Sequence, residues 1–209
     1  FLARDRFGIK PLIYAFDSNQ FIFASELKPI IDSKIIPIEL CDKSIDDFFY
    51  YGSVQQPKTI NKKVFHLMPS CYIEIDLPSM DYKIESYYNL LEESSKISMP
   101  NDYESSKNKL REVFEEATNY HMVSDVNIGA FLSGGVDSTA VVSMMQTLSE
   151  KKINTYTIGF KDNNNIIDET DIASRTAEFL GTNHNSIKIN LKDISSIFDN
   201  YILSLDQPS

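Results

Sequence analysis

The sequence has too few cysteines for disulfides to hold the fold together. There are two, Cys41 and Cys71, and no cluster of histidine and cysteine accompanies them. Neither a disulfide framework nor a zinc site is therefore expected. Two buried thiols in a reducing compartment are the simplest interpretation, which predicts a cytoplasmic protein.

Long apolar segments and a nucleotide-binding Gly-Lys-Ser/Thr string are also missing. No apolar run approaches the roughly 18 residues that a membrane-spanning helix needs. No signal peptide is visible. The missing Gly-Lys-Ser/Thr string excludes the P-loop of kinases and GTPases. We expect no membrane partner.

Basic residues are in short supply. The chain of 209 residues has 20 basic and 30 acidic residues, for a net charge of −10. The excess is shared, with 11 basic against 15 acidic residues in 1–102 and 9 against 15 in 103–209. Proteins that bind nucleic acids or anionic lipid through phosphates carry a basic surface. These partners are disfavoured, whereas a hydrophobic fraction of 42% is typical of a globular fold.

The two ends are unusual. The chain starts at Phe1 without an initiator Met, and it stops on the turn residues 206–209. We therefore expect a piece of a longer protein.

The first part of the chain, residues 1–91, is predicted to be α+β with antiparallel strands. Apolar residues 12–16 and 21–24 flank a turn cluster that starts at Asp17, which is typical of a hairpin. A further strand is predicted over 72–76 and short helices over 26–32 and 44–51. The polar stretch 92–102 is predicted to be a linker.

Residues 103–209 alternate between helical and strand patterns. Helices are predicted over 104–122, 168–180 and 191–205, and strands over 126–132, 155–160 and 186–189. Such alternation predicts an α/β fold with a doubly wound parallel sheet. Asp168 and Glu169 open one of these helices and are expected to stabilise its N-terminus electrostatically, although an approach to substrate from there stays open.

The segment Ser133-Gly134-Gly135-Val136-Asp137-Ser138 follows an apolar strand and precedes a helix. This places it at the C-terminal edge of the sheet, where α/β folds bind ligands. Glycines that tolerate positive φ, successive backbone N–H groups and two hydroxyls predict a nest for phosphate oxygens. Asp137 beside an anion suggests a bridging Mg²⁺. The alternative is a tight turn in which Ser133 caps the helix.

Residues 133–138 resemble the pyrophosphate-binding loop of the ATP-pyrophosphatases. Residues 124–132, 155–160 and 168–184 are similar to the surrounding elements of the glutamine-hydrolysing asparagine synthetases. Residues 3–12 and 23–28 resemble the end of a class II glutamine amidotransferase domain. The resemblance implies the rear of an N-terminal nucleophile amidotransferase domain, followed by a synthetase domain of the adenine-nucleotide alpha-hydrolase type.

The resemblance also implies roles for individual residues. Asp137 is expected to hold Mg²⁺. Arg4 and Asp5 could form an ion pair at an interface, and Glu26 could line an ammonia route, with a purely structural role as the alternative for all three. The residues expected to bind ATP are Phe131, Ser133, Gly134, Gly135, Asp137, Ser138 and Ile158.

The reaction implied for the full-length protein converts aspartate, glutamine and ATP into asparagine, glutamate, AMP and pyrophosphate through a β-aspartyl-AMP intermediate. The N-terminal cysteine nucleophile would lie upstream of Phe1. A Ser-Gly-Glu-x-x-Asp motif and a lysine would lie beyond Ser209. We therefore expect no glutaminase activity and negligible synthesis from residues 1–209 alone. A homodimer is compatible with the resemblance.

Three other functions stay open. A relative could amidate another carboxylate, such as that of a sugar, a peptide or a β-lactam precursor. A tRNA-modifying ATP-pyrophosphatase is opposed by the acidic charge and by the lack of a Cys-x-x-Cys pair. A non-catalytic, nucleotide-binding paralogue is opposed by the intact Ser133, Asp137 and Ser138.

Overall fold

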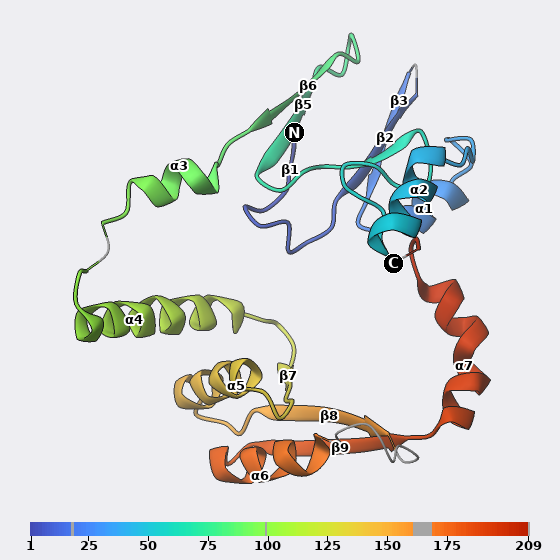
Figure 1. The fold of residues 1–209 in the computed structure, drawn as a ribbon. Coiled ribbons are helices and arrows are strands. Elements are labelled where there is room, and N and C mark those ends of the chain that lie inside the picture. Colours follow the sequence, from blue (N-terminus) through green and yellow to red (C-terminus); the bar gives the residue numbers. More distant parts are fainter. Residues whose placement is uncertain (18, 99, 161–168, 209) are drawn as a thin grey trace. The chain divides into compact units, whose positions relative to one another are not determined.

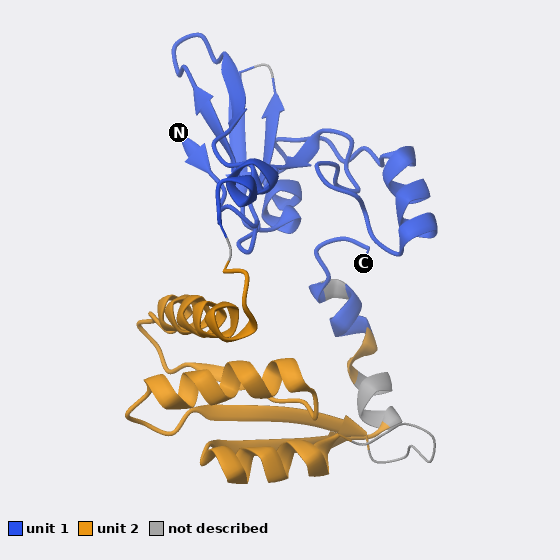
Figure 2. Ribbon diagram, turned by 60° about the vertical axis from the view of Figure 1, so that its left-hand side comes forward, with its two compact units in different colours: residues 1–98, 199–209 blue, residues 99–198 orange. Residues whose placement is uncertain are grey.

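The computed structural model describes residues 1–17, 19–98, 100–160 and 169–208. The chain divides into two compact units, which are shown in different colours in Figure 2. Unit 1 contains Phe1–Ser98 and Asp199–Ser209, and unit 2 contains Met99–Phe198. Each unit is described by itself.

Unit 1 contains two antiparallel sheets, as predicted. Their strand orders are β1-β5-β6 and β3-β2-β4. The predicted hairpin is confirmed, with Ile13 opposite Ala24 and Asp17 opposite Gln20. The elements of this unit (Figure 1) are β1 (Leu2–Ala3), β2 (Ile13–Asp17), β3 (Gln20–Ala24), α1 (Leu27–Asp32), α2 (Asp42–Tyr51), β4 (Val64–His66), β5 (Cys71–Ile75), β6 (Tyr82–Ser86) and α3 (Leu90–Ser95).

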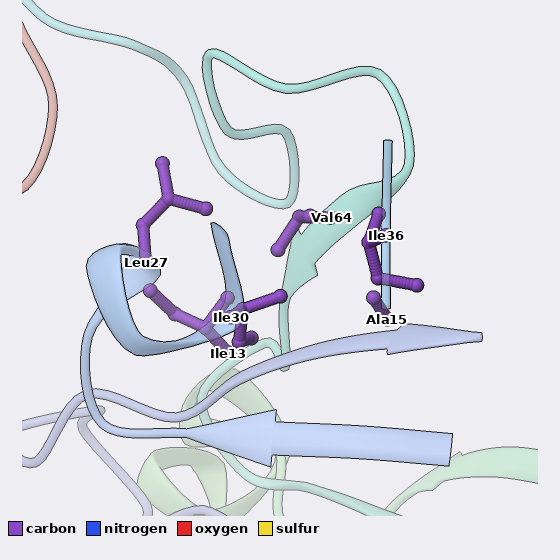
Figure 3. Close-up of a cluster of buried hydrophobic side chains, with 6 residues drawn as sticks. All are labelled: Ile13, Ala15, Leu27, Ile30, Ile36 and Val64. Atoms are coloured by element: carbon purple, nitrogen blue, oxygen red, sulfur yellow. The ribbon is translucent and has the colours of Figure 1, made fainter. Parts of the chain in front are cut away.

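Strand β2 lies at the centre of unit 1 because it is covered on both faces. Ile13 and Ala15 point to one face, where they meet Leu27 and Ile30 of α1 together with Ile36 and Val64 (Figure 3). Tyr14 points to the other face and packs with Leu67 and Ile73. A strand covered on both faces is apolar at successive positions, as the sequence of β2 is.

Helix α3 falls partly inside the stretch that we predicted to be a linker. Asn89 begins it, because its side-chain oxygen accepts hydrogen bonds from the N–H groups of Leu91 and Glu92. Asparagine is among the preferred residues at this position. The border between the two compact units lies within 92–102, and the domain limits themselves stay a prediction.

Unit 2 contains a three-stranded parallel sheet in the order β7-β8-β9, which confirms the predicted parallel arrangement. Leu132, which follows β7, packs with Val142 of α5 and with Ala173 and Ala177 of α6. The elements (Figure 1) are α4 (Tyr103–His121), β7 (Gly129–Phe131), α5 (Val136–Leu148), β8 (Asn154–Phe160), α6 (Thr170–Leu180), β9 (Asn183–Ile189) and α7 (Leu191–Ser204), which continues into unit 1.

Some predicted boundaries were wrong. The strand predicted over 126–132 is limited to Gly129–Phe131, and β9 begins three residues earlier than predicted. Helix α6 begins at Thr170, and Asp168 lies outside the described residues. Its end at Gly181 is as predicted, because this glycine has a φ of 73° in the left-handed region.

The last described residues belong to unit 1, where they bond to its backbone. The Asp206 carboxylate accepts hydrogen bonds of 2.6 and 2.7 Å from the N–H of Leu27, and one of 3.0 Å from Lys28. Gln207 accepts a hydrogen bond from the N–H of Ile60. Asp206 therefore satisfies the first N–H groups of α1, which have no partner within the helix.

Both cysteines are free, as expected, but Cys41 and Cys71 are half-buried rather than buried. Within the described ranges, every helix is too short or too polar to cross a bilayer.

The contact between Gln207 and His66 predicts a pH-dependent stability. The amide nitrogen of Gln207 lies 3.3 Å from Nε2 of His66. Because an amide nitrogen can only donate, Nε2 of His66 accepts this hydrogen bond, and the ring is neutral. Burial lowers the pKa of His66, the charge of Arg4 lowers it further, and Asp206 opposes them. The unfolded state therefore binds the proton more readily, and stability falls as the pH drops below about 6.5.

We predict that the free energy of unfolding decreases between pH 7.5 and pH 5.5, and that His66→Phe flattens this dependence. Urea titrations at the two pH values measure it. The exposed His121 offers a matched control, since His121→Phe is expected to retain the wild-type pH dependence. An identical pH dependence in His66→Phe and the wild type would contradict the prediction.

Candidate functional site

The candidate phosphate-binding loop comprises residues 133–138. It leaves β7 through the buried Leu132, whose N–H donates a hydrogen bond of 2.9 Å to the Tyr156 carbonyl of β8. The Leu132 carbonyl accepts a hydrogen bond from the hydroxyl of Thr157. Helix α5 begins at Val136, so the loop lies at the C-terminal edge of the parallel sheet, as predicted.

Two serine hydroxyls close the loop. Ser133 Oγ and Ser138 Oγ lie 2.7 Å apart, and the Ser133 N–H donates to Ser138 Oγ at 3.2 Å. The Gly135 N–H donates to Ser133 Oγ, also at 3.2 Å. Gly135 occupies the capping position of α5, and no side chain caps the helix there. The alternative in which Ser133 acts as a simple helix cap is therefore not what the structure shows.

The two glycines of the loop do not use the positive φ that we predicted for them. Neither Gly134 nor Gly135 has a positive φ. A Cβ atom on Gly134 would lie 3.3 Å from Cβ and Cγ2 of Ile172 and 3.6 Å from Cβ of Glu169. Gly134 thus suits the close approach of the first turn of α6 to the loop, because a larger residue would have to displace Ile172 by a few tenths of an ångström.

The loop presents hydrogen-bond donors to an anion. The Gly134 N–H donates to a carboxylate oxygen of Glu169 at 3.2 Å, so an anionic oxygen already lies against the backbone here. The first N–H groups of α5 have no carbonyl partner within the helix. Asp137 is exposed in the first turn of the same helix. The N–H groups suit phosphate oxygens, whereas the Asp137 carboxylate would need a cation between itself and the phosphate.

The described residues contain no cluster of three or more acidic, histidine or cysteine side chains that could hold a metal by themselves. A Mg²⁺ ion that binds phosphates commonly takes only one or two carboxylates from the protein. Asp137, which is exposed within the loop, fits that kind of site.

Phe131 and Ile158 lie on the same face of the sheet. Phe131 is paired with Tyr156 in the neighbouring strand, and Ile158 is two positions beyond Tyr156. All three are exposed, Phe131 by 78% and Ile158 by 53%. Tyr156 was not among the predicted site residues, although the alternation of β8 places it on this face.

Arg4 has a different role from the predicted ion pair. Its side chain is buried, and burial lowers its pKa, while the charge of Asp5 acts in the opposite direction. Among the ion pairs of the described residues, none joins Arg4 to Asp5. The guanidinium donates instead to the carbonyls of Gly8, Lys10 and Leu67 and to the side-chain oxygen of Gln56.

Asp5 shapes the backbone around Arg4. Its carboxylate accepts hydrogen bonds from the N–H groups of Lys10, Ile9 and Phe7, which lower its pKa. Glu26 is exposed at the start of α1 and does not cap that helix. The structure therefore brings Arg4 and Asp5 together in one backbone-binding cluster but leaves Glu26 outside it.

Two family models match the chain. A glutamine amidotransferase domain matches residues 1–88, and asparagine synthase matches residues 109–209. This combination defines the class of protein, an amidotransferase joined to a synthase.

Three relatives match the chain over most or all of its length. A Methanocaldococcus jannaschii protein provisionally named glutamine-hydrolysing asparagine synthetase 2 is 31% identical over 100% of the chain and 40% of its own length. Glutamine-hydrolysing asparagine synthetase 1 of Bacillus subtilis is 28% identical over 99% of the chain and 31% of its own length. The amidase chry2 of Gibberella zeae is 28% identical over 94% of the chain and 30% of its own length.

The chain belongs to the glutamine-hydrolysing asparagine synthetase family, as the resemblance in its sequence indicated. It spans 30% to 40% of the length of the three relatives.

The cluster around Arg4 predicts a large effect on stability. In Arg4→Met, the buried carbonyl of Leu67 loses its donor, and an unsatisfied buried acceptor costs about 1–3 kcal/mol. We expect the free energy of unfolding, measured by urea titration, to fall by at least that amount. Arg6 is exposed, and Arg6→Met is the matched control. Equal stability of the two variants would refute the structural role of Arg4.

Proposed function

We propose that the full-length protein forms an amide bond at the expense of ATP, with aspartate as acceptor and glutamine as nitrogen source. The products would be asparagine, glutamate, AMP and pyrophosphate, formed through β-aspartyl-AMP. The observation that carries this proposal is the serine-closed loop, whose Gly134 N–H donates to an anionic oxygen, in a chain of this family.

The roles of the loop residues follow from their chemistry. The N–H groups of Gly134 and Gly135 and the hydroxyls of Ser133 and Ser138 would bind the pyrophosphate portion of ATP. Asp137 would bind a Mg²⁺ that neutralises the phosphate charge. This reading assigns the parallel sheet to the adenine-nucleotide alpha-hydrolase type.

The exposed apolar residues of the sheet suit the base of the nucleotide. Phe131 and Ile158 would hold the adenine, and Tyr156 lies opposite Phe131 and two positions before Ile158. Planar bases are held by aromatic and aliphatic surfaces together with a few backbone hydrogen bonds. ATP supplies the adenylyl group that makes a carboxylate reactive, since AMP leaves more readily than a carboxylate oxygen.

The amidotransferase half would deliver ammonia, with its nucleophile outside residues 1–209. Cys41 and Cys71 are internal, so neither can offer a free α-amino group as its own base. Arg4 and Asp5 would stabilise the backbone at the rear of this domain, and Glu26 would lie near the ammonia route. The chain by itself is expected to hydrolyse no glutamine.

A second candidate keeps the chemistry and changes the acceptor carboxylate. The observation that favours it is the Gibberella zeae relative, which is named an amidase and matches 94% of the chain. The acceptor is therefore the least constrained part of the proposal.

The full-length protein tests the proposal. With aspartate, glutamine, ATP and Mg²⁺, we expect asparagine, glutamate, AMP and pyrophosphate in equal amounts. Release of AMP only when another carboxylic acid replaces aspartate would select the second candidate. Absence of AMP and pyrophosphate with any acceptor would contradict both.

The loop makes a prediction for the chain of 209 residues. Asp137→Asn removes the charge that would hold Mg²⁺, so we expect the affinity for Mg-ATP, measured by calorimetry, to fall at least about tenfold. The affinity for ATP in EDTA should change much less. The exposed Asp125 provides the control variant Asp125→Asn. Unchanged Mg-ATP affinity in Asp137→Asn would rule out this role.

A further inference from the structure

The carboxylate of Glu169 lies where the candidate site would receive a phosphate oxygen. Its Oε2 accepts a hydrogen bond of 3.2 Å from the N–H of Gly134, a residue 35 positions away in the chain. Both residues belong to unit 2, so the contact lies within one compact body. Gly134 is the first of the two glycines in the loop.

Glu169 does not use this carboxylate for its own helix. It occupies the capping position of α6, but its side chain makes no capping hydrogen bond. The described ion pairs do not include it. The nearby Arg175 donates instead to the carbonyl of Asp171. The carboxylate is therefore committed to the loop.

The packing holds Glu169 in place beside the loop. The ideal Cβ position of Gly134 lies 3.6 Å from Cβ of Glu169 and 3.3 Å from two atoms of Ile172. A side chain larger than that of glycine would therefore have to displace Ile172 by a few tenths of an ångström. Glu169 is itself exposed, and its hydrogen bond to the loop lies at a close contact between two elements.

The negative charges at the loop determine how a phosphate could bind there. A carboxylate and a phosphate oxygen compete for the same N–H donor, and the two anions repel each other at short range. Asp137, in the first turn of α5, adds a second negative charge to the loop. A phosphate can bind here only if the carboxylate gives way or a cation compensates the charges.

We propose that Glu169 is an internal competitor of phosphate at this loop, occupying the Gly134 N–H when no nucleotide is present and leaving it when pyrophosphate or ATP binds. The inference rests on the proposed function of the loop. It gives Glu169 a role in ligand binding beyond stabilising the start of α6. A phosphate without a metal must displace the Glu169 carboxylate unaided, whereas Mg²⁺ offsets the repulsion between the two anions.

The test compares binding of inorganic pyrophosphate in EDTA to the wild-type chain, Glu169→Ala and Glu169→Gln. Removing the competitor frees the Gly134 N–H, and a hydrogen bond to a charged group is strong enough to change the affinity about tenfold. Calorimetry should therefore show about tenfold tighter binding to Glu169→Ala. Glu169→Gln should show a smaller gain, because the amide oxygen still accepts a hydrogen bond without carrying charge.

Asp171 provides the matched control, since it is an acid in the first turn of the same helix. Asp171→Asn changes the net charge by the same amount as Glu169→Gln, and we expect it to alter pyrophosphate affinity less than twofold. An equal gain in Asp171→Asn would attribute the effect to overall charge and overturn the proposal. Unchanged or weaker binding in a folded Glu169→Ala would also overturn it, because a structural residue would give that result.

A second measurement does not depend on affinity. The amide resonance of Gly134 in a ¹⁵N-resolved spectrum should shift in Glu169→Ala and stay in place in Asp171→Asn. An unshifted Gly134 resonance in Glu169→Ala would show that the hydrogen bond is absent and would overturn the proposal.

The measurements distinguish failure of the proposed function from failure of the role of Glu169 alone. If the wild-type chain and Glu169→Ala both fail to bind Mg-ATP, the loop is not a nucleotide site, and the proposed function fails together with this inference. If the wild-type chain binds Mg-ATP and Glu169→Ala shows no gain for pyrophosphate, only the role of Glu169 fails.

Discussion

The polypeptide between the buried Leu132 and Val136 must leave the parallel sheet and begin a helix within three residues, and the arrangement of the second unit depends on this constraint. Leu132 is fixed between α5 and α6 by the apolar core, so the turn cannot move away from the sheet. The hydroxyls of Ser133 and Ser138 then close the turn through a hydrogen bond of 2.7 Å. The first N–H groups of α5 have no carbonyl partner within the helix and can bind a ligand, so the turn that the fold requires is also a candidate binding site.

The first unit depends on buried hydrogen bonding in a different way. Its central strand β2 is covered on both faces, and Arg4 joins segments that lie far apart in sequence by donating to backbone carbonyls. Buried charged groups are tolerated when their hydrogen bonds are satisfied. Asp206 follows the same rule at α1, where it accepts from backbone N–H groups 178 and 179 residues away.

Long elements with a clear period could be predicted from the sequence, and short or exposed ones could not. The hairpin of β2 and β3, the helix α4 and the parallel order of β7, β8 and β9 follow local patterns. Strand β1 has only two residues, and all five residues of β6 are exposed, so neither carries a periodic signal. Their pairing with β5 is a tertiary effect.

The candidate site shows the same limit. The loop residues 133–138 could be predicted because a strand, a turn and a helix follow one another directly. The contact of Glu169 with Gly134 spans 35 residues, and the acid by itself predicts only a favourable helix start. The same holds for Arg4, whose adjacent Asp5 suggested an ion pair, whereas its carbonyl partner on Leu67 lies 63 residues away.

A crystal structure of the full-length protein with Mg²⁺ and a non-hydrolysable ATP analogue tests the central claim most directly. We expect phosphate oxygens within hydrogen-bond distance of the N–H groups of Gly134 and Gly135, with the base beside Phe131 and Ile158. A nucleotide bound elsewhere, with Glu169 still bonded to the Gly134 N–H, would contradict it.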